Sequence, residues 1–259
     1  MKQTKAHVFT KILMILFFIV YYAPLLSIVV FSFNSERSVT YFGKFDLVWY
    51  KELFTDQRLI EIIFYTVLIA VIATVVSTII GTIAAICLTK MRKGFRKFVL
   101  QTTNFPIMNA DIVTAIGLLL LFVTLNVEKG YVTMLIAHIS FCTPYVIISV
   151  YPKVKSLDPN IMEAALDLGA KPLRAIKDAV LPQIKPTIFA AAAIAFTMSF
   201  DDFVISYFTG GPKLNISIYL YTEAKKINPT INALSTIIMI IIIGKIIVDK
   251  IKESRKEKK

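Results

Sequence analysis

Long runs of apolar residues, separated by short polar stretches, dominate this sequence. A run of about 20 residues is needed to cross the roughly 30 Å core of a bilayer as a helix. Six runs reach or approach that length, and as helices they would satisfy their own backbone hydrogen bonds, as lipid requires. They cover residues 12–33, 62–88, 98–125, 131–151, 187–207 and 231–248. The pattern predicts an all-α integral membrane protein with six transmembrane helices in one domain, residues 1–259.

The first apolar run follows three lysines and superficially resembles a signal peptide. It is longer than a signal-peptide core, and residues 34–37 after it offer no small-residue cleavage site. We therefore expect residues 12–33 to be retained as the first transmembrane helix. Composition agrees with the membrane class, because 56% of the 259 residues are hydrophobic.

Lysine and arginine residues are concentrated in alternate loops. Of the 29 in the chain, 21 fall in the N-terminal segment, the loops after the second and fourth runs, and the C-terminal tail. Positively charged loops stay in the cytoplasm, so both termini are predicted to be cytoplasmic. The net charge of +12 thus lies along membrane boundaries, facing lipid headgroups. It does not form the separate basic domain that would indicate a nucleic-acid-binding protein.

The outer loop, residues 34–61, mixes aromatic and charged residues around Trp49 and Tyr50. Trp and Tyr favour the membrane interface because each has an apolar ring and a polar tip. We expect a short interfacial helix here, with Trp49 and Tyr50 as structural anchors. The alternative is a direct contact with a substrate.

Few residues have the chemistry of a redox or metal site. Cys87 and Cys142 both lie in apolar runs, where a free thiol behaves as a small hydrophobe. The only histidines, His7 and His138, lie far apart and have no neighbouring cysteine or paired carboxylate. We predict no disulfide framework, no metal site and no cofactor in this chain.

Residues 152–186, between the fourth and fifth runs, are too many for a simple turn between antiparallel helices. This 152–186 loop contains Asp158 before Pro159, then Gly169, then Pro172. Asp followed by Pro is typical of a helix start, and Gly of a helix end. We predict a helix-turn-helix on the cytoplasmic face, with Pro172 at the start of its second, short helix.

Five residues of this loop form a spaced pattern. They are Glu163, Ala164, Ala165, Gly169 and Pro182. Their spacing resembles the EAA motif of bacterial ABC importer permeases, with one alanine in place of a usual isoleucine. The resemblance implies the type I ABC importer permease fold, in which these residues belong to the coupling helix that docks on an ATPase subunit. Small alanines allow close approach, and glycine allows a sharp reversal. The alternative is an ordinary amphipathic surface helix.

The phosphate-binding pattern Gly-x-x-x-x-Gly-Lys-Ser/Thr does not occur in the chain. ATP and its Mg²⁺ are therefore expected on a partner ATPase, and the chain itself is not expected to be an enzyme. The resemblance also implies a second homologous permease subunit, an extracellular or periplasmic solute-binding protein, and a place in the bacterial inner membrane.

Three acids interrupt the apolar runs: Asp111 in the third, and Asp201 and Asp202 in the fifth. Carboxylates at membrane depth normally face a cavity or pathway, because each costs at least about 2.5–3.5 kcal/mol on insertion scales. We therefore expect Asp111, Asp201 and Asp202 to be substrate-pathway residues. Neighbouring residues on a helix point about 100° apart, so one of the adjacent pair can face a pathway while the other caps or pairs locally. The alternative is that all three hold helices together.

The sequence from Ser199 to Ser206 resembles the fifth-span motif of spermidine/putrescine permeases of the PotC type. Other matching segments are Trp49-Tyr50, Gly81-Thr82, Ala84-Ala85, Asp111-Ile112-Val113, Gly211-Pro212 and Asn232 to Thr236, which together extend over roughly residues 10–248. Tyr65 and Ala110 depart from residues common in that family. The resemblance implies the permease subunit of an ATP-driven polyamine importer working by alternating access. Three carboxylates at membrane depth, with no Lys or Arg in the middle of a span, are suited to the transport of a polycation.

Two other functions are compatible with parts of this pattern. A permease of the same fold could carry another solute, such as iron, thiamine or phosphonate; an anionic solute should favour Arg or Lys within the spans. An intramembrane metal-dependent enzyme could use the three acids, but no phosphate-binding pattern or Ser–His pair accompanies them.

Overall fold

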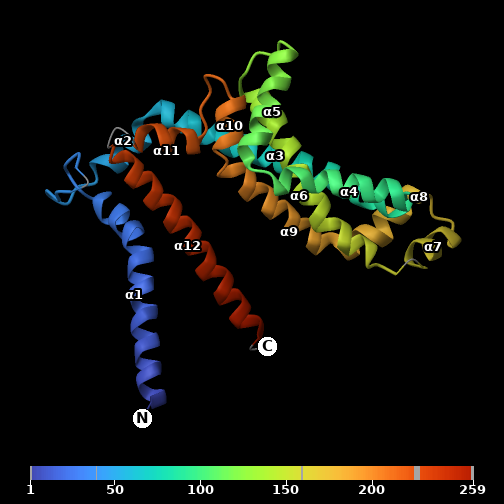
Figure 1. Ribbon diagram of the computed structural model, residues 1–259, viewed down its shortest axis with the longest axis horizontal. Helices are drawn as coiled ribbons and strands as arrows, with labels where there is room; N and C mark the ends of the chain where they lie inside the picture. The colour runs from blue at the N-terminus through green and yellow to red at the C-terminus, as the bar shows by residue number, and fades with distance from the viewer. Residues whose placement is uncertain (1, 39, 159, 225–227, 258–259) are drawn as a thin grey trace. The chain divides into compact units, whose positions relative to one another are not determined.

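The structure is a computed structural model that describes residues 2–38, 40–158, 160–224 and 228–257. The helices, shown in Figure 1, are α1 (Lys2–Phe31), α2 (Val48–Thr55), α3 (Gln57–Lys90), α4 (Lys93–Met108), α5 (Asp111–Thr124), α6 (Tyr131–Lys155), α7 (Asn160–Asp167), α8 (Pro172–Ala175), the π-helical η1 (Ile176–Val180), α9 (Leu181–Phe200), α10 (Val204–Thr209), α11 (Ile216–Ala224) and α12 (Thr230–Glu257). Within these ranges the extended structure is limited to an isolated bridge between Asn34 and Phe45. The predicted helical class is confirmed.

Four helical segments of the described chain are long and apolar enough to cross a membrane. They are Thr10–Phe31, Gln57–Lys90, Tyr131–Lys155 and Pro172–Phe200. The pair α4 and α5 passes the same test but is bent by 106°, and the apolar part of α12, Thr230–Lys245, is shorter. The structure thus shows four spans, or five if the bent pair is one, and the prediction of six stays a prediction.

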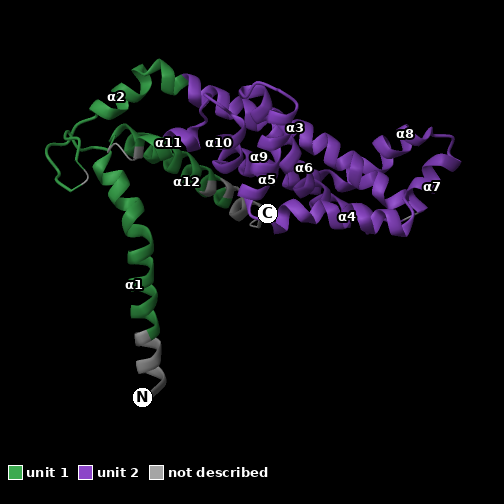
Figure 2. Ribbon diagram, turned by 45° about the horizontal axis from the view of Figure 1, so that its top comes forward, with its two compact units in different colours: residues 1–60, 220–259 green, residues 61–219 purple. Residues whose placement is uncertain are grey.

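The chain divides into two units, Met1–Ile60 with Leu220–Lys259, and Glu61–Tyr219 (Figure 2). In the first unit, α12 contacts α1 and α2. The loop after α1 is organised by Asn34, whose side-chain amide donates to the carbonyl of Tyr41 at 2.8 Å and whose oxygen accepts from the backbone of Gly43 at 2.8 Å. A buried amide with its donors and acceptor satisfied holds the loop in one conformation.

In the second unit, α6 packs along α9 and against α4 (Figure 1). Small residues permit this approach: Ala191 and Ala195 of α9 are fully buried in the same cluster as Cys142 of α6. A Cβ added to Gly81 of α3 would lie 2.6 Å from Cγ1 of Val146, so only glycine fits there. Close backbone approach at small residues is how membrane helices associate.

The third and fifth predicted spans differ from continuous helices. α4 ends at Met108 and α5 begins at Asp111, because Asn109 and Ala110 are in extended conformations. The fifth run is likewise divided, since α9 ends at Phe200 and α10 begins at Val204. Apolar patterning does not reveal such breaks, and continuous helices over 98–125 and 187–207 were wrong predictions. Asp111 follows the first break directly, and Asp201 and Asp202 lie within the second.

Candidate functional site

Asp111 is the first residue of α5, directly after the bend. Its side chain is exposed, and it forms no hydrogen bond or ion pair with another side chain in the described ranges. A carboxylate in the first helical turn is stabilised by the positive end of the helix dipole. Asp111 therefore presents its carboxylate on an exposed surface directly after the break.

Asp202 holds the second break together. Its carboxylate accepts hydrogen bonds from the backbone of Ile205 at 3.2 Å and of Ser206 at 2.7 Å, and from the Ser206 hydroxyl at 2.8 Å. Two of these donors are backbone groups at the start of α10, which have no partner within that helix. Asp202 thus caps α10, and its carbonyl also accepts from the amide of Asn215 at 2.6 Å.

His138 of α6 connects this cap to two helices. Its Nε2 lies 2.8 Å from Oγ of Ser206 and 3.4 Å from the Asp202 carboxylate, and its Nδ1 lies 2.6 Å from Oγ of Ser199 in α9. The side chains of His138 and Asp202 are only 2% and 8% exposed. We call His138, Ser199, Asp202, Ser206 and Asn215 the His138 network.

The hydrogen-bond geometry assigns one tautomer to His138. The single hydroxyl proton of Ser206 goes to Asp202, so Ser206 accepts from Nε2 of the imidazole and from the Asn215 amide at 2.8 Å. Ser199 finds its acceptor, among the described residues, in Nδ1 of His138. With these directions the ring donates through Nε2 and accepts at Nδ1. Every polar group of this buried network is then satisfied.

Asp201 and Asp202 therefore occupy different environments. The Asp201 side chain is exposed, whereas that of Asp202 is buried in the His138 network. The carbonyl of Asp201 accepts from the hydroxyl of Ser217 at 3.0 Å, which fixes the backbone but leaves the carboxylate outward. This is the arrangement in which one acid of the pair caps locally and the other is free for another role.

Sequence analysis missed His138 because its partners lie 61 to 68 positions away in the chain. One signal was present. A histidine inside an apolar run must find hydrogen-bond partners when it is buried, and the serines flanking Asp201 and Asp202 were candidates.

The 152–186 loop contains α7, which carries Glu163, Ala164 and Ala165. The helix ends at Asp167, and Gly169 in the turn that follows has a φ of +83°, which is in the left-handed region. The backbone of Gly169 donates to Leu166 at 2.8 Å, and that of Ala170 donates to Ala165 at 3.1 Å. This pair of bonds is a Schellman motif. It gives Gly169 a conformational role. The predicted helix start at Pro159 lies outside the described residues.

The second helix of the loop begins at Pro172, as predicted, but continues without a gap into α9. Its middle is π-helical, with the backbone of Leu181 donating to Ile176 five residues earlier. Pro182 has no N–H, and in an α-helix its ring would clash with the carbonyl four residues before it. The wider π-turn accommodates Pro182 inside this long helix.

Two leucines project from the loop beside its turn. Leu168 is 89% exposed and Leu173 is 82% exposed. Glu163 and Ala164 are exposed too, while Ala165 is partly buried. Large apolar side chains exposed on a polar loop are a common feature of surfaces that bind a partner. The sequence analysis did not select these leucines, although leucines beside a helix-ending glycine are a usable signal.

Trp49 and Tyr50 lie on α2 in the other unit. Trp49 is 5% exposed; its ring nitrogen donates to the carbonyl of Asn34, and the Arg37 guanidinium lies 5.5 Å from its ring. The Tyr50 hydroxyl is 2.8 Å from that of Ser32. Both residues fasten α2 to the end of α1, and their role at the membrane interface stays a prediction.

Comparison with known proteins identifies relatives over most of the chain. Residues 77–254 match the family model for the binding-protein-dependent transport system inner membrane component. The putrescine transport system permease protein PotI of Escherichia coli K12 is 35% identical over 238 residues, covering 88% of this chain and 84% of the relative. The spermidine/putrescine transport system permease protein PotC of Haemophilus influenzae is 31% identical over 239 residues, covering 90% and 93%.

Solved structures show the same fold. A bacterial ABC transporter involved in the import of the acidic polysaccharide alginate has a chain with a TM-score of 0.69 and 17% identity, over 98% of this chain and 96% of that one. A complex of a bacterial alginate ABC transporter with an alginate pentasaccharide-bound periplasmic protein has a TM-score of 0.69 and 15% identity, over 95% and 93%. At these identities the likeness concerns the fold alone.

Proposed function

Because this chain belongs to the binding-protein-dependent transport system inner membrane component family, we propose that it is the permease subunit of an ATP-driven importer of polyamines, putrescine or spermidine. The observation that carries the proposal is identity of 31–35% with polyamine permeases over 84–93% of their length. The chain is a multi-pass inner-membrane protein and is not an enzyme, since these relatives are transport permeases.

The exposed acids are suited to a polycation. Asp201 follows the C-terminal end of α9, where unpaired carbonyls carry the negative end of the helix dipole. Half-helix C-terminal ends next to a carboxylate are favourable sites for cations in transporters. Asp111 supplies a second exposed carboxylate at the other helix break. We assign Asp111 and Asp201 to the substrate pathway, and Asp202 to holding the break that presents Asp201.

The 152–186 loop is the proposed contact with the ATPase. Glu163 and Ala164 of the EAA pattern are exposed on α7, and Leu168 and Leu173 offer the apolar area that a protein partner would cover. The rigid turn at Gly169 fixes the angle between α7 and the helix that continues into α9. Movement of the docked ATPase would thereby be transmitted to the helix that ends at Asp201.

The complete importer would then work by alternating access. It would contain six spans from this chain with both termini cytoplasmic, a homologous second permease, ATPase subunits that hold ATP and Mg²⁺, and a solute-binding protein. The alginate transporter of the same fold, in complex with a periplasmic protein, supports the last of these.

Uptake in cells that lack this chain tests the proposal. We expect loss of labelled putrescine or spermidine uptake, restored by the intact chain. Uptake of iron, thiamine and phosphonate in the same cells is the control. Normal polyamine uptake together with lost uptake of one of those other solutes would show that a permease of this fold carries that solute instead.

A further inference from the structure

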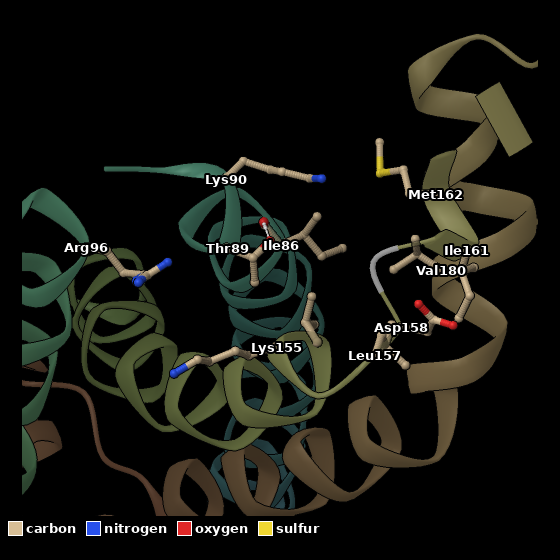
Figure 3. Close-up of a pocket in the computed structure, with 11 residues that line it drawn as sticks. Ile86, Thr89, Lys90, Arg96, Lys155, Leu157, Asp158, Ile161, Met162 and Val180 are labelled. Atoms are coloured by element: carbon tan, nitrogen blue, oxygen red, sulfur yellow. Dashed lines mark hydrogen bonds between the residues drawn. The ribbon is translucent and has the colours of Figure 1, made fainter. Parts of the chain in front are cut away.

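A cavity of about 220 Å³ lies where the ends of α3 and α6 meet the beginnings of α4 and α7 (Figure 3). All of its lining residues belong to the second unit. It is separate from the acids at the helix breaks and from the exposed face of the 152–186 loop. Neither the proposed substrate pathway nor the proposed ATPase contact uses this cavity.

Three cationic side chains line this cavity: Lys90 in the last turn of α3, Arg96 in the first turn of α4, and Lys155 at the end of α6. None of the three forms an ion pair with a described residue. Figure 3 shows the amine of Lys90 reaching across the opening towards Met162 of α7.

One acid, Asp158, also lines the cavity, and it has a local role. Its carboxylate accepts from the backbone of Asn160 at 3.0 Å, capping the start of α7. The cavity is thus lined by three cations and by a single carboxylate that is already engaged. Like charges held together repel unless an anion is bound between them, and phosphate oxygens are strong acceptors for such groups.

The rest of the lining is apolar. Ile86, Leu157, Met162 and Val180 form part of the wall beside the cations. A small soluble anion would use the cations but would leave these side chains without a function. An amphipathic molecule with an anionic head uses both.

The position of the cavity identifies the source of that molecule. Lys90 and Lys155 end two of the helices that are long enough to cross the membrane. The cavity therefore lies at the depth where a bilayer places its phosphate groups, and basic pockets between membrane helices at that depth bind anionic headgroups. We propose that this cavity binds an anionic phospholipid of the phosphatidylglycerol type, with its phosphodiester on Lys90, Arg96 and Lys155.

The bound lipid would contact both membrane helices and two parts of the 152–186 loop, through Met162 on α7 and Val180 on the π-helix. It would brace the loop against the ends of α3 and α6. This consequence for coupling rests on the proposed function, whereas the binding itself does not.

Binding is tested on the purified full-length chain in neutral detergent, by native mass spectrometry during titration with phosphatidylglycerol or phosphatidylcholine. We expect saturable binding of phosphatidylglycerol, and an affinity at least about tenfold weaker in the triple variant Lys90→Gln, Arg96→Gln, Lys155→Gln. The matched control is Arg92→Gln, Lys93→Gln, Lys97→Gln, which removes the same charge from the same region but not from the cavity. We expect less than about a twofold change there.

Four results would overturn the proposal. Equal loss in both triple variants would mean diffuse attraction to the basic surface. Equal binding of phosphatidylcholine would remove the anionic requirement, and displacement of the lipid by millimolar inorganic phosphate would indicate a soluble anion. The charge-preserving variant Lys90→Arg with Lys155→Arg is the control for misfolding, and it should retain lipid binding. Loss of binding in this variant, if the chain is still folded, would also contradict the site. Because no transport is measured, these outcomes are independent of the proposed function.

Discussion

Two adjacent carboxylates, Asp201 and Asp202, differ in exposure and hydrogen bonding. Asp202 receives three hydrogen bonds from α10, whereas Asp201 is exposed at the end of α9. Their roles could not be separated from the sequence, since the pattern showed only that one could face a pathway while the other capped locally. The partners that decide it, His138 and Asn215, come from distant parts of the chain.

The exposed acid should act through its charge. Asp201→Asn is expected to leave membrane abundance near normal and to lower polyamine uptake by about 10- to 100-fold, because a hydrogen bond to a charged group contributes about 1.5–3 kcal/mol. Asp111→Asn should act in the same direction but more weakly. The measurement is uptake of labelled spermidine per amount of subunit. Unchanged normalised uptake in both variants would remove these acids from the pathway.

The buried histidine should act through stability. His138→Ala leaves Ser199 without its acceptor and removes one of the two donors to the Ser206 hydroxyl oxygen, and we expect the free energy of unfolding to fall by about 1–3 kcal/mol. His138→Gln retains one donor and one acceptor and should recover part of that loss. Thermal unfolding of the purified chain in detergent measures both. An unaltered melting temperature in His138→Ala would contradict the described network.

At the scale of elements, helices were predictable and their breaks were not. The apolar run 98–125 contains Pro106 within α4, yet the chain bends only at Asn109 and Ala110. The break after Phe200 has neither Gly nor Pro. It is stabilised by Asp202 and its tertiary partners, and such contacts between distant residues leave no local pattern.

The turn of the 152–186 loop was predictable because its chemistry is local. Gly169 has a φ of +83° and no atom within 4 Å of an added Cβ, so substitution costs backbone strain without a steric clash. Gly169→Val should cost about 1–2 kcal/mol at the turn and uncouple ATP hydrolysis from uptake, with the subunit still inserted. Gly169→Asn, which tolerates this conformation better, is the control. Normal coupled uptake by Gly169→Val would refute the role of the turn.

The exposed leucines give a second test of the loop. Leu168→Ser with Leu173→Ser should leave the melting temperature unchanged, because both side chains are already exposed. It should weaken co-purification of the ATPase by about tenfold or more if they are buried in that contact. Lys171→Ser, exposed on the same turn, is the control. Equal ATPase recovery from wild type and the double variant would place the docking surface elsewhere.

At the scale of the whole molecule, the family and helical class followed from the sequence, since the EAA spacing and apolar runs are local patterns. The number of spans did not follow fully. The described chain has four or five, because α4 and α5 are bent and the apolar part of α12 is short. The membrane and the partner subunits would act on the α4–α5 pair and on α12. The local pattern of apolar residues does not contain their effects.

The most direct test of the account is uptake of labelled spermidine and putrescine by proteoliposomes that contain this chain with the second permease, the ATPase and the solute-binding protein. The account predicts uptake that requires ATP on the side of the membrane that carries the ATPase and the solute-binding protein on the opposite side. It predicts no uptake when this chain or any partner is omitted. Polyamine uptake by this chain alone, or by the complex without ATP, would contradict it.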